Sequence, residues 1–373
     1  MTSTASVWLV YHLSGSPFAV GLIYFAGNAP VMLLAPFAGV WIDRVDCLKV
    51  VRLTQILGAL QSAAMAIIAF SGHMSVPVLF WISLVQGLIN AVDFPARQTI
   101  TYQLAEQRSL LDNIIALNSV TFNLARLIGP AIAGFIIAAW GPAVCFTIDS
   151  VSYSAVLTAL AWVSLVPRAQ RREVPHPWAD LKDGIRYCWT HPRIRRILTL
   201  VPFMSLIGFG YMVLAPVFAK DIYGGDARTL GFLMSATGVG AVLAGLFLGT
   251  RKDPKQLPKL MALGAGICGL GQLAIGAFGN RALALLAFGA SGTGTAMTMV
   301  AGNTSLQTTL EDDKRGRVMS IFTVGQSFLP LGSLMIGALA EAWGPRWTMA
   351  ACGVSCLAAA LIYRRTVPKG DPA

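Results

Sequence analysis

Long apolar stretches separated by short polar segments dominate this sequence. Eleven of them reach about the 20 residues that an α-helix needs to cross roughly 30 Å of hydrocarbon. They end at turn residues or charges, as at Trp140-Gly-Pro142 and Trp343-Gly-Pro345. The pattern therefore predicts an all-α membrane protein whose full spans cover residues 18–41, 50–71, 75–96, 113–140, 142–165, 197–219, 228–249, 257–278, 281–303, 317–340 and 345–363.

A shorter apolar segment, residues 5–13, precedes the first full span. It is too short to cross a bilayer and is expected to be the second half of a first helix. Two explanations stand: the true start lies upstream of Met1, which we favour, or the protein lacks half a helix. The predicted architecture is eleven full spans plus a half helix, truncated at the N-terminus.

The composition agrees with a chain dissolved in lipid. Hydrophobic residues make up 55% and charged residues 12%, whereas soluble domains carry about 25% charged residues. This excludes an ordinary cytosolic enzyme, a disordered chain and a disulfide scaffold. The six cysteines form no CxxC pair and indicate small buried hydrophobes. Because no Walker loop, zinc signature or nucleophile elbow is present, we expect no enzyme, no metal and no organic cofactor.

The basic residues alternate in density from one loop to the next. The net charge is +11, and 23 of the 28 Lys and Arg residues lie in one alternating set of loops and tails, against four in the other set. Cytoplasmic loops of membrane proteins are enriched in Lys and Arg. The asymmetry predicts a multi-pass protein of a bacterial inner membrane with its C-terminus in the cytoplasm. It also explains the positive charge without a nucleic-acid partner.

The longest hydrophilic stretch, residues 166–196, divides the chain in the middle. Its segment from Trp178 to Trp189 has apolar residues at helical spacing and predicts an amphipathic helix on the inner membrane surface. The predicted parts are a helix bundle over 1–165, a cytoplasmic linker over 166–196 and a second bundle over 197–373.

The two halves repeat one another. Trp140-Gly-Pro142 recurs as Trp343-Gly-Pro345, and the same offset relates Gly129 to Gly332 and Gly134 to Gly337. Parallel repeats joined by a basic linker are typical of transporters in which two halves move about a site near the membrane midplane.

A motif follows the first full span: Gly39, three further residues, then Asp43 and Arg44. It resembles the signature between the second and third helices of the major facilitator superfamily, although Cys47 and Leu48 stand where relatives usually have basic residues. Glycine lets helices approach closely. The resemblance implies a cytoplasmic gate in which Asp43 and Arg44 form an ion pair.

Further motifs resemble one branch of that superfamily, the enterobactin-exporter-like proteins or transmembrane secretion effectors. They run from Asn90 through Asp93 to Arg97, and from Asn118 through Asn123 and Arg126 to Gly129-Pro130 and Gly134. The last three residues also resemble a helix-packing motif associated with antiporters, with Ala133 replacing one expected Gly. The resemblance implies two six-helix bundles and export driven by the proton gradient, with no other cofactor.

Three ionisable residues inside the predicted spans are candidates for function, because a charge at the bilayer centre costs about 2.5–3.5 kcal/mol. Asp93 lies near the inner end of its span, and we expect a gate contact with Arg97 or with Asp43 and Arg44. Arg126 is either a substrate or proton-relay contact or a clamp on the carbonyl groups near Pro130.

Asp149 lies about 12 Å deep at 1.5 Å per residue. It is either a proton carrier or an acceptor of an interhelical hydrogen bond. Polar residues within spans either line the substrate pathway or bond neighbouring helices, and these are Tyr24, Asn28, Asn90, Asn118 and Asn123.

The sequence thus favours a monomeric transporter in the lipid bilayer that exports a small amphipathic molecule, a siderophore or a drug, in exchange for protons. Two alternatives stay open: an uptake permease of the same fold, and a truncated membrane protein without transport activity.

Overall fold

The computed structural model describes residues 1–42, 45–103, 108–163, 186–251, 253, 256–310 and 312–366. These residues form helices and contain no strand. Eleven helices or helix runs are long and apolar enough to cross a membrane. The predicted all-α membrane fold with eleven full spans is confirmed.

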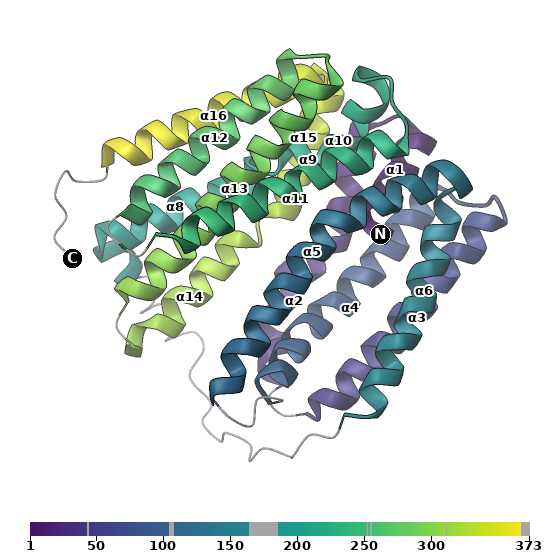
Figure 1. Ribbon diagram of the computed structural model, residues 1–373, viewed down its shortest axis with the longest axis horizontal. Coiled ribbons are helices and arrows are strands. Elements are labelled where there is room, and N and C mark those ends of the chain that lie inside the picture. The colour runs from purple at the N-terminus through teal and green to yellow at the C-terminus, as the bar shows by residue number, and fades with distance from the viewer. Residues whose placement is uncertain are drawn as a thin grey trace. The chain divides into compact units, whose positions relative to one another are not determined.

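The described residues of the first half of the chain form six helices, which Figure 1 labels. The first has 13 residues, about 20 Å at 1.5 Å per residue, and it is not among the candidate spans. It is the short first helix that the sequence predicted around residues 5–13. The six are α1 (Thr2–Ser14), α2 (Pro17–Ile42), α3 (Cys47–Phe70), α4 (Val76–Gln103), α5 (Arg108–Trp140) and α6 (Pro142–Ala161).

The second half begins with a helix run that is broken several times, and one of its later spans is also broken. The run consists of α8 (Pro192–Ile207), α9 (Gly210–Val213), α10 (Ala215–Val217) and the π-helical turn η1 (Phe218–Ile222). The rest is α11 (Ala227–Gly249), α12 (Leu257–Ala277), α13 (Arg281–Thr309), α14 (Asp312–Gln326), α15 (Leu329–Trp343) and α16 (Pro345–Thr366).

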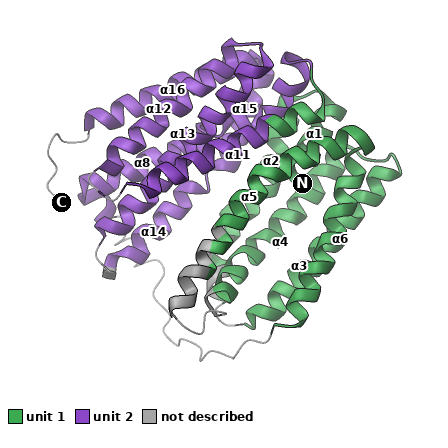
Figure 2. Cartoon of the chain, in the orientation of Figure 1, with its two compact units in different colours: residues 1–173, 225–232 green, residues 174–224, 233–373 purple. Residues whose placement is uncertain are grey.

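The chain forms two compact units, which Figure 2 colours separately. The first holds residues 1–173 and 225–232, and the second holds 174–224 and 233–373. Residues 166–185 lie outside the described ranges, so the amphipathic linker helix stays a prediction.

Two of the predicted spans are not continuous helices, which the hydropathy pattern did not indicate. Pro330 lacks the N–H that would bond the carbonyl of Gln326, and the helix is interrupted there, between α14 and α15. In the run from α8 to η1, the break after Ile207 frees backbone carbonyls. The side-chain amide of Gln272 donates to the carbonyl of Gly208 at 2.9 Å. Hydrocarbon tolerates irregular backbone only where such partners exist inside the protein.

The two Trp-Gly-Pro sequences form the same turn. Gly141 has φ 85° and ψ 168°, and Gly344 has φ 83° and ψ 154°. Residues with a Cβ rarely adopt positive φ, so both turns require glycine. The matching backbone at matching positions supports the internal repeat found in the sequence.

Glycine also sets the distance between α2 and α4. A methyl group added at Gly87 would lie 2.8 Å from the carbonyl oxygen of Gly27 and 2.9 Å from that of Ala26. Both neighbours are backbone atoms, which cannot rotate away. The two helices therefore pack backbone against backbone at this crossing.

We predict that Gly87→Ala lowers the stability of the protein by about 1–3 kcal/mol, the usual cost of overpacking. Gly245→Ala is the matched control, because Gly245 in the interior of α11 is also a helix glycine but has open space where its Cβ would lie. Alanine favours a helix over glycine by about 1 kcal/mol, so the control is expected to keep or raise stability. Thermal unfolding of both variants in detergent measures the difference, and equal midpoints would contradict the backbone crossing.

Candidate functional site

A line of polar side chains follows the face of α3 that packs on α4 and α6. Thr54, Gln55, Gln61 and Ser62 are all buried. Positions separated by three, four and seven residues lie on one face of a helix. The partners of this face include two acids, Asp93 on α4 and Asp149 on α6. We call the set the polar seam, and it consists of Thr54, Gln55, Gly58, Gln61, Ser62, Asp93, Asp149 and Tyr153.

Asp93 holds one end of the polar seam with three partners. One carboxylate oxygen accepts from the Thr54 hydroxyl at 2.5 Å and from the Gln55 amide at 2.9 Å. The other pairs with Nε of Arg97 at 2.5 Å. The Asp93 side chain is 12% exposed and that of Arg97 is 51% exposed. A nearly buried charge is thus compensated by one base and two neutral donors.

The Asp93–Arg97 contact is the one expected from the sequence, and Thr54 and Gln55 are partners that the sequence did not indicate. Gly39 lies in the last turn of α2. Asp43 and Arg44 lie outside the described residues, so their ion pair stays a prediction. The helix α4 continues to Gln103, beyond the predicted end near residue 96, and this places Asp93 well inside the helix.

Asp149 holds the other end of the polar seam in a different way. Its carboxylate accepts from the Ser62 hydroxyl at 2.7 Å. The next residue, Ser150, donates to the carbonyl of Ala59 at 3.0 Å and ties α6 to α3. Among the residues that the structure describes, no base lies within ion-pair distance of Asp149, and Arg126 does not pair with it. Asp149 is therefore an intramembrane acid held by a neutral hydroxyl.

Tyr153 lies between the two acids. Its side chain fits against Gly58, where an added methyl group would lie 2.8 Å from two ring carbons and from the hydroxyl oxygen. Its hydroxyl is hydrogen-bonded to Gln86 of α4, and it interacts electrostatically with both Asp149 and Asp93. The α3 positions that serve the two acids, Gln55 and Ser62, are about 10 Å apart along the helix axis. The polar seam thus connects two acids that lie at different depths along the membrane-spanning helix α3.

The residues predicted to line a substrate pathway occupy partly or fully exposed positions. Asn28 donates to the carbonyl of Tyr24 at 2.9 Å within α2, and Asn90 accepts from Gln86 at 3.0 Å within α4. Asn118 and Asn123 are exposed along α5, and Arg126 on the same helix is half-buried. These residues differ from the polar seam, whose α3 side chains are buried.

The three helix-packing residues have different surroundings. A methyl group added at Gly134 would lie 2.5 Å from the carbonyl oxygen of Ala227 and 3.1 Å from Cα of Gly231, in the part of α11 that belongs to the same compact unit. The carbonyl oxygen of Pro130 approaches Gly231 in the same way. Gly129 has no such neighbour. Close packing therefore involves Gly134 and Pro130.

Arg52 is a further residue that sequence reasoning counted only as a loop charge. Its guanidinium donates to the carbonyl of Leu160 at 2.7 Å and to that of Val163 at 3.4 Å, at the end of α6. A cation at a helix C-terminus satisfies free carbonyls and interacts favourably with the helix dipole. The α3 part of the polar seam could have been found in the sequence, because polar residues at positions 54, 55, 61 and 62 recur at helical spacing within an apolar stretch.

A family model described as transmembrane secretion effector matches residues 1–373. Curated relatives are similar at low identity. The Staphyloferrin A transporter of Staphylococcus aureus is 25% identical over 95% of this chain and 89% of its own length. The multidrug efflux pump Tap of Mycolicibacterium fortuitum is 24% identical over 96% and 89%. The enterobactin exporter EntS of Escherichia coli O81 is 25% identical over 95% and 82%.

Solved structures share the fold. The nucleoside transporter NupG matches with a TM-score of 0.74 at 14% identity, covering 98% of this chain and 94% of that one. A bacterial homolog of the human lysosomal transporter Spinster, in an inward-facing and occupied conformation, gives 0.71 at 16% identity over 98% and 94%. The chain therefore belongs to the transmembrane secretion effector family and is a multi-pass membrane transporter of the major facilitator type.

Proposed function

We propose that this protein exports a small amphipathic molecule of the siderophore or drug class and that proton entry drives the export. Relatives named for staphyloferrin A transport, enterobactin export and multidrug efflux support the substrate class. The observation that carries the coupling is Asp149, an acid inside a membrane-spanning helix that bonds the Ser62 hydroxyl and no described base.

This arrangement suits a group that must gain and lose a proton. The Ser62 hydroxyl donates to the charged carboxylate, and it can accept from the neutral carboxyl after its own proton rotates away. Asp149 has a neutral hydroxyl and no described base as its partner, so the proposed uptake and release of a proton breaks no ion pair.

Asp93 is suited to a gate instead. Its carboxylate pairs with Arg97, and Thr54 and Gln55 fix its position. In the proposed cycle this group closes the cytoplasmic side together with Gly39, Asp43 and Arg44. Re-pairing of these charges accompanies each closure.

The pathway itself is proposed to run past polar groups that are not buried within the helix bundle. A half-buried arginine inside a span is costly unless it meets water or an anion, so Arg126 would contact a negatively charged group of the substrate. Tyr24, Asn28, Asn90, Asn118 and Asn123 would supply hydrogen bonds. Gly134 and Pro130 would hold α5 close to its neighbour, with Gly129 in the same motif.

We further propose that the transporter works as a monomer in the bacterial inner membrane. The linker 166–196 and the C-terminus would lie in the cytoplasm, as the distribution of basic residues indicates. The proton gradient would be its energy source, with no metal or organic cofactor.

Transport assays on a panel of siderophores and toxic compounds test the proposal. Strains that lack or overproduce the protein are expected to differ in intracellular accumulation, with less substrate retained on overproduction. Proteoliposomes with an imposed pH gradient then test coupling for the substrate found. Greater accumulation on overproduction would point to an uptake permease, and no difference for any compound would favour a protein without transport activity.

We predict that Asp149→Asn lowers the rate of proton-driven transport by roughly tenfold or more, while substrate exchange without a gradient persists. A tenfold loss of rate corresponds to about 1.4 kcal/mol in activation free energy. The amide keeps the shape of the side chain but cannot carry the proton. Ser62→Ala is the control, because it removes the hydrogen bond and keeps the carboxyl group, and we expect it to retain most of the coupling. Equal loss in both variants would assign Asp149 a structural role only.

We also predict that Arg97→Gln destabilises the protein more than Asp93→Asn does. Loss of Arg97 leaves a nearly buried carboxylate with two neutral donors, whereas loss of the Asp93 charge leaves a cation that is half exposed to solvent. Thermal unfolding in detergent measures both variants. The reverse order would contradict the assignment of Arg97 as the counter-ion.

A further inference from the structure

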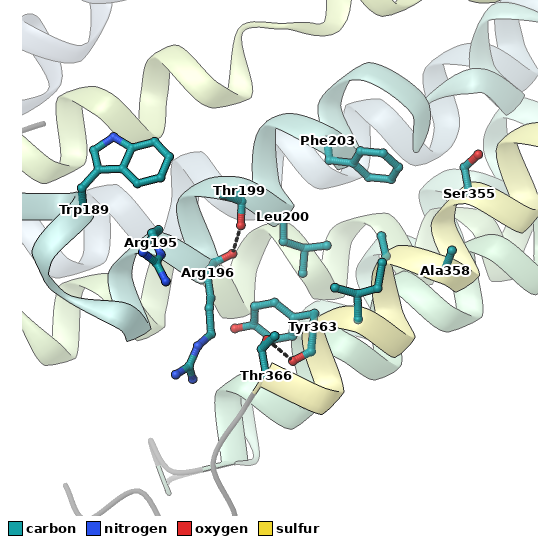
Figure 3. Close-up of a pocket in the computed structure, with 12 residues that line it drawn as sticks. Trp189, Arg195, Arg196, Thr199, Leu200, Phe203, Ser355, Ala358, Tyr363 and Thr366 are labelled. Carbon is teal, nitrogen blue, oxygen red and sulfur yellow. Dashed lines mark hydrogen bonds between the residues drawn. The ribbon is translucent and has the colours of Figure 1, made fainter.

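A groove between α8 and α16 in the second compact unit is not used by the proposed transport cycle. It has a volume of about 570 Å³, within the range of about 300–1,000 Å³ that is usual for ligand sites. Figure 3 shows its lining, which includes Trp189, Arg195, Arg196, Phe203, Ala358 and Ile362.

The two ends of the groove differ in chemistry. Trp189, Arg195 and Arg196 lie at one end, and Phe203 lies near the other (Figure 3). The side chains in between are mostly apolar, and the only charged residues of the lining are the two arginines. The groove is therefore apolar along most of its length and cationic at one end. We call the end with Arg195 and Arg196 the cationic mouth.

The dimensions of the groove match one leaflet of a bilayer. On α16 it extends from Ser355 to Thr366, which is about 16 Å along the helix, or half of a hydrocarbon core of roughly 30 Å. Thr366 ends one candidate span, and Pro192, close to the two arginines, begins another. The cationic mouth thus lies at the level where hydrocarbon meets the headgroups.

The mouth of the groove carries the positive charge of Arg195 and Arg196. Among the described residues, no acid lies within ion-pair distance of Arg195 or Arg196. Arginine binds phosphate through its planar set of donors. Trp189 is 61% exposed, and tryptophan is enriched at membrane interfaces. Ile362, 64% exposed on the apolar wall, needs an apolar neighbour.

We propose that this groove is a binding site for an anionic phospholipid. Its phosphate lies between Arg195 and Arg196, and one acyl chain follows Ile362, Ala358 and then Phe203 toward the middle of the bilayer. Basic pockets between membrane helices are a known way of holding anionic headgroups. A lipid in this position contacts both α8 and α16 and ties their ends together. The inference depends neither on the direction of transport nor on its coupling.

Native mass spectrometry of the full-length protein in mild detergent tests the site, with phosphatidylglycerol and phosphatidylcholine as probes. The wild-type protein is expected to retain phosphatidylglycerol preferentially. The double variant Arg195→Gln with Arg196→Gln should lose that retention by roughly tenfold. The control is Arg364→Gln with Arg365→Gln, which removes the same charge from exposed residues at the end of α16 outside the groove, and retention should persist.

Equal loss in both double variants would mean general attraction between charges and would overturn the proposal, as would equal retention of the two lipids. Ala358→Trp separates a lipid from a soluble anion, because it fills the apolar wall and leaves both arginines in place. Ala358 is exposed, so the variant is expected to fold, which its thermal unfolding checks. Phosphatidylglycerol should be lost from this variant. Undiminished binding, or displacement of the lipid by free glycerol phosphate, would overturn the proposal.

Discussion

Polar groups inside a hydrocarbon layer must find partners within the protein, because water is not available to them. Much of the described structure follows from this constraint. Gln272 bonds the carbonyl that the break after α8 sets free. Arg52 bonds two carbonyls at the end of α6. The buried hydroxyl and amide groups of α3 serve the two acids of the polar seam. Each of these contacts joins different helices, so the same bonds that satisfy polar atoms also fix how the helices are arranged.

The two acids show how differently one constraint can be met. Asp93 has a base and two neutral donors, which hold it in one position. Asp149 accepts from a neutral hydroxyl and pairs with no described base. The difference comes from the neighbouring helix positions and not from the side chains, since both residues are aspartates in long apolar helices. This difference in partners is the reason for proposing Asp93 as a gate residue and Asp149 as the proton site.

Much of the fold could be predicted from the sequence, because span length and hydropathy follow directly from the thickness of hydrocarbon. The short first helix around residues 5–13 could be predicted in this way. The Asp93–Arg97 contact could also be predicted, because the two residues lie about one helical turn apart on the same helix. The breaks in the run from α8 to η1 could not be predicted, because the partner that permits one of them, Gln272, is on another helix. Thr54 and Ser62 were missed for a similar reason. Which face of α3 meets α4 and α6 depends on how the helices pack, and a hydropathy profile does not contain that information.

The paired Trp-Gly-Pro turns have a consequence for how the two halves diverge. Each turn needs a residue without a side chain at Gly141 or Gly344, whatever molecule the transporter carries. Selection on backbone geometry acts there independently of selection on cargo. The two turns can therefore stay alike while the residues that line the two bundles change to suit different substrates. An ancestral duplication can then still be recognised at these turns after the similarity has been lost at other positions.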